Sequence, residues 1–221
     1  MSPLSDRASL YAHLHAGTAA LGMAPSAQAH DQLLDYVELL LRWNASYNLT
    51  AVRDPLEMVT RHLLDCLAVA PFVQGDSLAD LGSGAGLPGI PLAILTPARE
   101  HVLIDSNGKK TRFLREAVRA LGLNNVRIEQ ARVEDTRGQF DCITARAFAT
   151  LKDMLALGGH LLAPDGIWLA MKGLLKEDEI LAVPAGFQVA DVRPLAVPGL
   201  GAARHVIIVR RAQLLAQEHA A

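Results

Sequence analysis

Apolar residues recur at helical spacing along the first part of the chain. The three segments with this pattern cover residues 3–22, 27–47 and 55–71. In the second segment Leu33, Val37 and Leu40 would lie on one face of a helix. The third segment starts at Asp54 and Pro55, which are residue types that cap a helix and occupy its first turn. Residues 1–74 are therefore predicted to form an N-terminal helical extension.

From residue 75 the pattern changes to short apolar runs that alternate with helical segments, which is typical of a parallel sheet with right-handed crossovers. The predicted strands cover residues 77–82, 101–105, 126–130, 140–145 and 167–171. The predicted helices cover residues 90–95, 109–121, 151–163 and 174–181. Two more strand-like runs, 187–194 and 204–210, have no helix between them and indicate an antiparallel hairpin. The fold class is α/β, with a mostly parallel, seven-stranded Rossmann-like sheet in residues 75–221.

The composition is that of a globular protein with a full core, because 51% of the 221 residues are hydrophobic and 20% are charged. The formal net charge is −2. This value does not exclude nucleic acid as a partner, since basic residues cluster locally. The cluster comprises Lys109, Lys110, Arg112, Arg115 and Arg119. A solvated helix face is the ordinary interpretation of such a stripe, and contact with RNA phosphates is the alternative.

Cysteine and histidine usage bears on compartment and metal binding. The two cysteines, Cys66 and Cys142, have no metal-ligand spacing and are too few for a disulfide framework, which favours a reducing compartment. The histidines show no ligand spacing beyond His13 and His15, so no metal site is predicted. The start of the chain lacks a secretory leader pattern, and no apolar run approaches the length of about 20 residues that spans a membrane. We expect a cytoplasmic, monomeric protein that does not bind membranes.

A glycine-rich stretch, LADLGSGAGLPGIPL at residues 78–92, separates the first predicted strand from the next helix. In an open parallel sheet such a loop lies over the carboxyl ends of the strands, where ligands bind. Gly82, Gly84 and Gly86 allow the backbone to turn sharply and to approach a ligand closely. Asp105 ends the second strand, where a carboxylate can accept both hydroxyl groups of a ribose. The loop therefore predicts a nucleoside-containing cofactor.

Two cofactors fit this loop. For NAD the glycine triplet would be Gly84, Gly86 and Gly89, but the pyrophosphate would then lie near the carboxylate of Asp80. For S-adenosylmethionine the pattern runs Asp80-x-Gly82-x-Gly84-x-Gly86, and an acid suits a ligand with a sulfonium and an ammonium group. The electrostatics and the closing hairpin favour a methyltransferase. An NAD-dependent oxidoreductase that uses the same loop is the alternative, and a binding module without chemistry is a third hypothesis.

The methyl acceptor is predicted from residues that follow the strands. No Asn-Pro-Pro-Tyr-like loop follows the fourth strand, and both cysteines lie in apolar segments, so amino and covalent cysteine chemistry are disfavoured. An acceptor that is already nucleophilic at neutral pH is favoured, and N7 of guanine qualifies because it has a free lone pair and needs no deprotonation. Arg132, Arg146 and Lys172 follow strand ends and are predicted to be catalytic, in contact with RNA and cofactor, with Arg146 at the methionine carboxylate or a phosphate. Phe148 is a candidate for stacking on a base, whereas Trp43 is expected in the core.

Several motifs carry a resemblance to a known family. They are RWNASYNLTAVRDPLEMVTRHLLDCLAVAP, LADLGSGAGLPGIPLAIL, LIDSNGKKTRFL, ARVED, TARAFATL and MKG. Together, from about residue 34 to residue 210, they resemble the bacterial small-subunit ribosomal RNA methyltransferase G family. The resemblance implies an S-adenosylmethionine-dependent methyltransferase fold and transfer of a methyl group to guanine N7 in the 530 loop of 16S ribosomal RNA, with the RNA, the small subunit or an assembly intermediate as partner.

The resemblance also carries cofactor positions to this chain. They are Gly82 and Leu87 in the glycine loop, Val133 and Glu134 after the third strand, and Arg146 after the fourth. The segment with Val133 and Glu134 is the one that usually meets the adenine in this fold. These positions adjoin the residues predicted from the loop itself, so we expect one continuous cofactor site that releases S-adenosylhomocysteine after the transfer.

Overall fold

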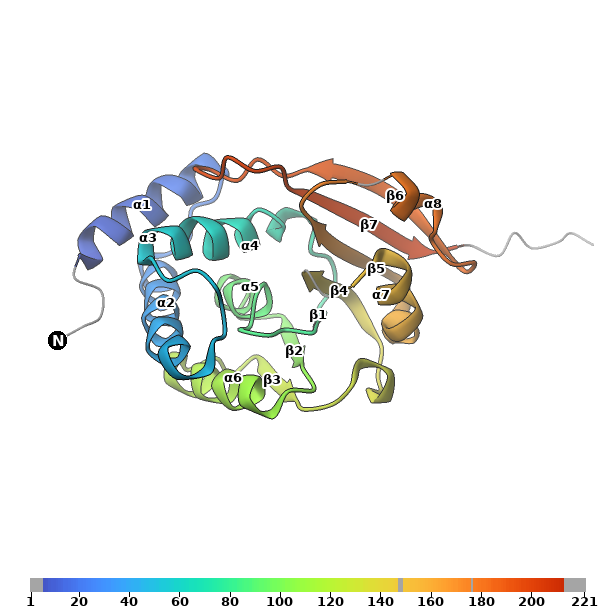
Figure 1. Ribbon diagram of the computed structural model, residues 1–221, viewed down its shortest axis with the longest axis horizontal. Helices are drawn as coiled ribbons and strands as arrows, with labels where there is room; N and C mark the ends of the chain where they lie inside the picture. The colour runs from blue at the N-terminus through green and yellow to red at the C-terminus, as the bar shows by residue number, and fades with distance from the viewer. Residues whose placement is uncertain (1–5, 147–148, 176, 213–221) are drawn as a thin grey trace, which may run out of the picture.

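A seven-stranded sheet with the order β3-β2-β1-β4-β5-β7-β6 forms the centre of the molecule (Figure 1). The computed structural model describes residues 6–146, 149–175 and 177–212. The strands are β1 (Ser77–Leu81), β2 (Glu100–Ile104), β3 (Val126–Glu129), β4 (Phe140–Arg146), β5 (Leu162–Lys172), β6 (Phe187–Pro194) and β7 (His205–Arg211). Strands β1 to β5 pair in parallel, and β7 runs antiparallel to both β5 and β6. The predicted fold class, including its closing hairpin, is confirmed.

The helices follow the predicted order along the chain. They are α1 (Arg7–Ala20), α2 (Ala27–Tyr47), α3 (Pro55–Met58), α4 (Asp65–Leu67), α5 (Gly89–Leu95), α6 (Gly108–Leu121), α7 (Leu151–Gly158) and α8 (Glu177–Leu181). Side-chain caps fix several of the starts, for example Ser26, whose hydroxyl oxygen accepts the Ala29 N–H at 3.1 Å. A π-helical segment, η1 (Val59–Leu64), joins α3 to α4, so the predicted third helix is continuous but changes its hydrogen-bond pattern.

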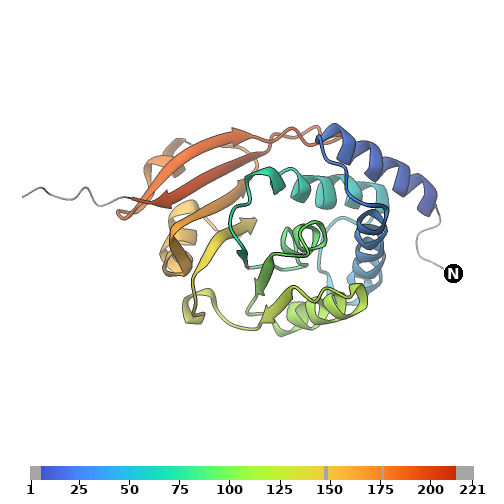
Figure 2. The ribbon, with the colours of Figure 1, turned by 180° about the vertical axis from the view of Figure 1, so that it is seen from behind.

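The helices cover the two faces of the sheet unequally (Figure 2). Helices α5 and α6 lie on one face, and the N-terminal helices pack outside them; α7 and α8 lie on the other face. Buried residues of the N-terminal helices, such as Leu33 and Leu64, belong to the same core cluster as Phe113 of α6 and Leu78 of β1. The extension and one face of the sheet therefore share a single core.

Trp43 packs against the core but is only partly buried, and its ring contacts Phe113 with the ring centroids 5.8 Å apart. Cys66 and Cys142 are also buried, and burial raises the pKa of Cys142 to about 12 and that of Cys66 further above its usual range. Both thiols are therefore protonated near neutral pH and are small core residues. Within the described residues, no helix combines the length and the apolar character needed to cross a bilayer.

One boundary differs from the prediction. The helix expected over residues 151–163 ends as α7 at Gly158 and passes through a 3-10 turn, η4 (Gly159–Leu161), into β5. Strand β5 therefore begins at Leu162 instead of residue 167, and Leu162 pairs with Phe140. Two glycines in sequence and Pro164 shortly afterwards disfavour continuation of the helix. Gly158 is also required for packing, since a Cβ there would lie 2.6 Å from Leu81.

Candidate functional site

The glycine loop after β1 adopts the backbone conformation that its sequence predicts. Gly82, Gly84 and Gly86 all have positive φ angles, of 66°, 58° and 86°. A Cβ built on Gly84 would meet only the carbonyl oxygen of Gly82, at 3.8 Å, so this position faces open space. A Cβ on Gly86 would lie 2.6 Å from Ile90 and 2.9 Å from Leu114. The missing side chain of Gly86 thus allows α5 and α6 to pack closely against the loop.

Asp80 supports this loop from beneath instead of facing a ligand. It is fully buried, its Oδ2 accepts the Gly89 N–H at 3.1 Å, and its Oδ1 accepts the Thr144 hydroxyl at 3.2 Å. Its strand neighbours Ala79 and Leu81 lie in the core on the other face, so alternation turns Asp80 toward α5. Burial raises its pKa to about 7. The predicted cofactor contact is corrected to a contact with the loop backbone.

Two adjoining cavities lie above the carboxyl ends of the strands. The first has a volume of about 590 Å³, and the second of about 490 Å³. They share Gly82, Lys110 and Arg146, which makes them parts of one site. The predicted residues that line the first cavity are Gly82, Gly84, Leu87, Arg146 and Lys172. Those that line the second are Gly82, Asp105, Arg132, Val133, Glu134 and Arg146.

The second cavity contains the acid that follows β2. The Oδ2 of Asp105 accepts the Gly84 N–H at 2.9 Å, and its Oδ1 accepts the Asn107 N–H at 2.8 Å. The Nζ of Lys110 lies 3.6 Å from Oδ2. Asp105 therefore ties the glycine loop to the start of α6, and at 6% exposure it remains at the cavity wall. The backbone of the loop is preorganised by this carboxylate.

The short helix η3 (Val133–Asp135) forms the opposite wall of the second cavity. Val133 is buried there, whereas Glu134 is partly exposed. The side chain of Arg132 is 73% exposed and lies 3.8 Å from the carboxylate of Glu134. A cation held this loosely at the rim is free to contact an incoming polyanion.

Arg146 is held by a carboxylate that the sequence did not reveal as a site residue. Asp65 is 3% exposed, and its Oδ2 accepts a hydrogen bond from Arg146 at 3.2 Å. Its Oδ1 accepts a second bond, from the Nε of Arg204 at 2.9 Å. One buried carboxylate of the helical extension thus binds arginines from β4 and from the residue before β7. Asp65 thus offsets one of the two positive charges, and the cluster keeps a net charge of about +1.

A hydrogen-bond chain from the helical extension reaches the first cavity. The side chain of Asn44 accepts the Thr50 N–H at 2.9 Å and donates to the Thr50 carbonyl at 3.0 Å. The hydroxyl of Thr50 lies 2.8 Å from Nε2 of His62. Burial, together with the charge of Arg146, lowers the pKa of His62 to about 4. His62 is therefore neutral at physiological pH, and it lies in the π-helical segment η1, a type of turn that is frequent at functional sites.

Lys172, which was predicted to be catalytic, is held by two contacts within the protein. Its ammonium group donates to the Ala149 carbonyl at 2.8 Å and forms an ion pair with Glu179 of α8. It reaches the cavity wall but is anchored on both sides, which indicates a structural contribution in this position. Phe148, the predicted stacking residue, lies outside the described residues.

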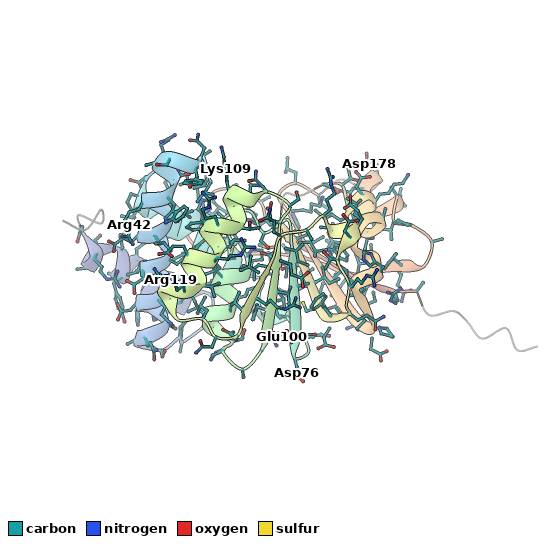
Figure 3. All side chains as sticks on the ribbon, turned by 90° about the horizontal axis from the view of Figure 1, so that it is seen from below. Arg42, Asp76, Glu100, Lys109, Arg119 and Asp178 are labelled. Carbon is teal, nitrogen blue, oxygen red and sulfur yellow. The ribbon has the colours of Figure 1, made fainter. Side chains whose placement is uncertain are left out.

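The basic stripe on α6 continues from the second cavity. Lys109, Arg112 and Arg115 line a shallow groove together with Asn107, which also belongs to the second cavity. Figure 3 shows Lys109 at one end of α6, far from Asp76 and Glu100, which mark the amino ends of β1 and β2. In the described chain no acidic side chain forms an ion pair with these three cations, whereas Arg119 is paired with Glu116 at 2.8 Å. The unpaired part of the stripe is the part next to the site.

The site as a whole fits a nucleoside cofactor beside an acceptor. Gly84 leaves space for a ligand at the loop, and Asp105 and η3 supply a carboxylate and an apolar wall in the second cavity. The cavity residues that the sequence did not identify as part of the site are Thr50, His62, Asp65 and Arg204, and Lys110 was considered only as part of the basic cluster. Thr50 and Asp65 lie within the long motif RWNASYNLTAVRDPLEMVTRHLLDCLAVAP, whose particular sequence was the available signal.

Known proteins resemble this chain over most of its length. The family model described as rRNA small subunit methyltransferase G matches residues 29–207. A protein of Stenotrophomonas maltophilia (strain K279a) named Ribosomal RNA small subunit methyltransferase G is 55% identical over 204 residues, which cover 91% of this chain and 95% of that protein. The solved structure of the mitomycin 7-O-methyltransferase MmcR matches with a TM-score of 0.57 at 19% identity, over 94% of this chain and 76% of that one. The ribosomal protein L11 methylase of Lactobacillus delbrueckii subsp. bulgaricus matches with a TM-score of 0.54 at 21% identity, over 67% and 76% of the two chains. The two structures support the fold alone.

Proposed function

This chain belongs to the rRNA small subunit methyltransferase G family and is an S-adenosylmethionine-dependent rRNA methyltransferase, and from this premise we propose its methyl acceptor. The proposed acceptor is N7 of a guanine in the 530 loop of 16S rRNA. The observation that carries the cofactor assignment is the open space at Gly84 next to the Asp105 carboxylate. The acceptor follows from the site chemistry described next. After the transfer, the cofactor product that the enzyme releases is S-adenosylhomocysteine.

The cofactor would lie across both cavities. Asp105 would accept the ribose hydroxyls, and Val133 and Glu134 would meet the adenine in the second cavity. The loop at Gly82, Gly84 and Leu87 would hold the methionine half in the first cavity. Arg146, which borders both cavities, is our candidate for the methionine carboxylate. When bound, the cofactor supplies an electrophilic methyl group on a sulfonium.

The residues of the site suit an acceptor that is already nucleophilic. Guanine N7 keeps its lone pair on the major-groove edge, so no general base is required and positioning supplies most of the catalysis. The buried thiols are protonated, which argues against a cysteine nucleophile. N7 methylation places positive charge on the base, and Asp65, which pairs with both Arg146 and Arg204, partly offsets the guanidinium charge of Arg146. Arg146 therefore opposes this charge less than an unpaired arginine would.

The RNA would approach over the rim of the second cavity. Arg132 is exposed there, and the groove formed by Lys109, Arg112 and Arg115 offers further unpaired cations for phosphates. Lys172 would contribute from the other side of the first cavity by shaping the wall. We also propose that the helical extension, residues 1–74, helps to seat the RNA, and that a monomer acts in the cytoplasm on 16S rRNA, on the small subunit or on an assembly intermediate.

Methyl transfer to defined rRNA tests this function. Purified protein and radiolabelled S-adenosylmethionine are incubated with 16S rRNA, and separately with small subunits, from cells that lack the enzyme. We expect label in a 7-methylguanosine of the 530 loop after nuclease digestion and nucleoside mass spectrometry. Label at another base or position would refute the proposed acceptor. Absence of transfer with tight ligand binding would favour a binding module.

Calorimetry separates the cofactor alternatives. We expect the protein to bind S-adenosylhomocysteine and to show no heat of binding with NAD. The reverse result would favour an oxidoreductase that uses the glycine triplet Gly84, Gly86 and Gly89.

A further inference from the structure

A further groove lies outside the two cavities of the site, where helices α2 and α6 pack side by side. Its volume of about 530 Å³ falls within the range of about 300–1,000 Å³ that is usual for ligand sites. Its wall combines aromatic and charged side chains from both helices. They include Arg42, Trp43, Ser46 and Tyr47 of α2, and Glu116 and Arg119 of α6. None of these six residues lines either cavity of the site, so the groove is a separate feature.

Three aromatic rings lead from the core to this groove. Phe113 is fully buried, and its ring centroid lies 5.8 Å from that of Trp43. The ring centroid of Trp43 lies 5.0 Å from that of Tyr47, the last residue of α2. Trp43 and Tyr47 both border the groove and are both partly exposed. The buried ring supports the two outer rings, which therefore form a preorganised aromatic surface in the groove.

Positive charge surrounds the aromatic pair. Arg119 is paired with Glu116 at 2.8 Å, whereas Arg42 forms no ion pair within the described residues. The two arginines against one glutamate leave an excess of one positive charge in the groove. Figure 3 shows Arg42 and Arg119, with Lys109, over this pair of helices, while the three acidic residues that it labels lie away from them. The groove therefore suits an anionic ligand that also carries a flat ring.

The groove continues the basic path that starts at the second cavity. Asn107 belongs both to that cavity and to the basic groove on α6. Arg112 of the basic groove donates a hydrogen bond from Nη1 to the Tyr47 hydroxyl oxygen at 3.4 Å. At the other end of the helix pair, Nε2 of Gln32 donates to the Leu121 carbonyl at 3.0 Å, so α2 and α6 run in opposite directions. A strand that follows α6 away from the site thus meets Tyr47 after the first cations.

We propose that this groove is a second contact site for the rRNA, in which an unpaired base stacks on Tyr47 and Trp43 while the adjoining phosphates contact Arg42 and Arg112. Proteins bind unpaired RNA by stacking its bases on aromatic rings and by placing cations along its backbone. Paired bases are stacked inside a duplex, so the occupant is a single-stranded segment. The inference rests on the proposed approach of the RNA over α6, and it adds a nucleotide subsite outside the cofactor and acceptor cavities.

The acid in the groove is compatible with a base as occupant. Glu116 accepts two hydrogen bonds from Arg119, at 3.0 and 2.8 Å, so its charge is balanced by a neighbour. The exocyclic amino groups of bases are donors that a carboxylate can accept. An apolar protein helix would instead require a wide apolar surface, whereas charged side chains flank the two rings here. The composition of the groove therefore favours RNA over a protein partner.

RNA binding by the full chain tests this subsite. The Kd is measured for 16S rRNA and separately for small subunits, both from cells that lack the enzyme, with S-adenosylhomocysteine at saturation. Tyr47→Ala removes the ring, whereas Tyr47→Phe keeps the ring and removes the hydroxyl that contacts Arg112. We expect Tyr47→Ala to raise the Kd for 16S rRNA about 5- to 100-fold, and Tyr47→Phe to stay within about twofold of wild type.

Salt dependence separates stacking from phosphate contacts. Stacking neutralises no phosphate, so Tyr47→Ala should keep the wild-type slope of log Kd against log salt. Arg42→Ala should reduce the size of that slope by about 1. Phe187→Ala removes a partly buried ring from β6, at the edge of the sheet opposite β3, and should bind the RNA like wild type. All four variants should keep wild-type affinity for S-adenosylhomocysteine.

A second pair of variants leaves the aromatic packing intact. Ser46 is exposed in the groove next to Tyr47. Ser46→Glu adds a negative charge where the strand would lie, and Ser46→Gln adds nearly the same bulk without the charge. We expect Ser46→Glu to weaken RNA binding at least about fivefold more than Ser46→Gln does. This comparison decides the case if a thermal unfolding scan shows that Tyr47→Ala is poorly folded.

Four results would overturn the inference. They are wild-type RNA affinity in folded Tyr47→Ala, an equal loss in Tyr47→Phe, equal affinities in the two Ser46 variants, and a loss confined to small subunits with free 16S rRNA bound normally. The last result would assign the groove to a ribosomal protein. Wild-type protein that binds neither 16S rRNA nor small subunits would instead refute the proposed function. Label at a base outside the 530 loop would refute the proposed acceptor and leave these affinities unchanged.

Discussion

Gly84 gives the sharpest test of the loop, because its effects on stability and on binding can be worked out separately. Its φ of 58° strains any side chain, and a β-branched residue in this conformation costs about 1–3 kcal/mol of unfolding free energy. The free protein has room for the side chain, since only the Gly82 carbonyl lies within 4 Å of the Cβ, at 3.8 Å. In Gly84→Val the side chain enters the cavity that the methionine half would fill. We expect S-adenosylhomocysteine affinity to fall more than about 100-fold, a loss of more than about 2.7 kcal/mol.

Gly122 provides a matched control for the strain. It has a φ of 64° at the end of α6, and a Cβ there would meet nothing within 4 Å. Gly122→Val should therefore lose a similar unfolding free energy in urea titrations and keep full ligand affinity by calorimetry. Gly86→Ala should lose more stability than the glycine strain alone, since its Cβ would lie 2.6 Å from Ile90. Wild-type affinity in Gly84→Val, or an equal affinity loss in Gly122→Val, would refute the assigned contact.

The remaining predictions concern surface charge and pH. Arg132→Ala should change the unfolding free energy by less than about 0.5 kcal/mol, because its side chain is 73% exposed, yet lower methyl transfer at least about fivefold; normal transfer would remove it from the site. The double variant Arg112→Ala and Arg115→Ala should reduce the slope of log Kd for rRNA against log salt by about 1–2, while Arg193→Ala on the opposite edge strand should leave it unchanged. Burial lowers the pKa of His101 from 6.5 to about 4, so its contribution to stability is complete above pH 6.5 and is lost as pH falls toward 4. Between pH 6.5 and pH 4, the unfolding free energy of His101→Gln in urea titrations should fall by about 2 kcal/mol less than that of wild type. Identical pH profiles of the two proteins would contradict the lowered pKa of His101.

The order of elements was predictable from the sequence because each one depends on local patterning. Short apolar runs predicted the strands, and the absence of a helical pattern between residues 194 and 204 predicted the hairpin of β6 and β7. The start of β5 was missed because residues 162–166 form a strand through pairing with Phe140, a contact that local periodicity does not encode. Tertiary pairing decided that boundary.

The part of the site that follows the strand ends was predictable, because parallel strands place their carboxyl ends at one edge of the sheet. Gly84 and Asp105 follow the consecutive parallel strands β1 and β2, so the order of strands along the chain places them at the same edge of the sheet. Asp80 was expected at the ligand, but the alternation of β1 turns its side chain toward the loop backbone. Asp65 and Arg204 meet across 139 positions, and no spacing rule connects them. In the sequence, Asp65 and Arg204 resemble the charged residues found on any helix or at any strand end, and only the fold shows that they meet.

The shared carboxylate of Asp65 has a consequence for the order in which the protein matures. One of its two arginine partners, Arg204, lies just before the last strand and is among the last residues of the site to be synthesised. A nascent chain that has already folded its glycine loop would still hold this buried acid with a single counterion, Arg146. Asp65 therefore reaches its full set of ion pairs only after the residues that precede β7 have been made, so the wall of the first cavity that contains Asp65 and Arg204 is the last part of that cavity to be completed.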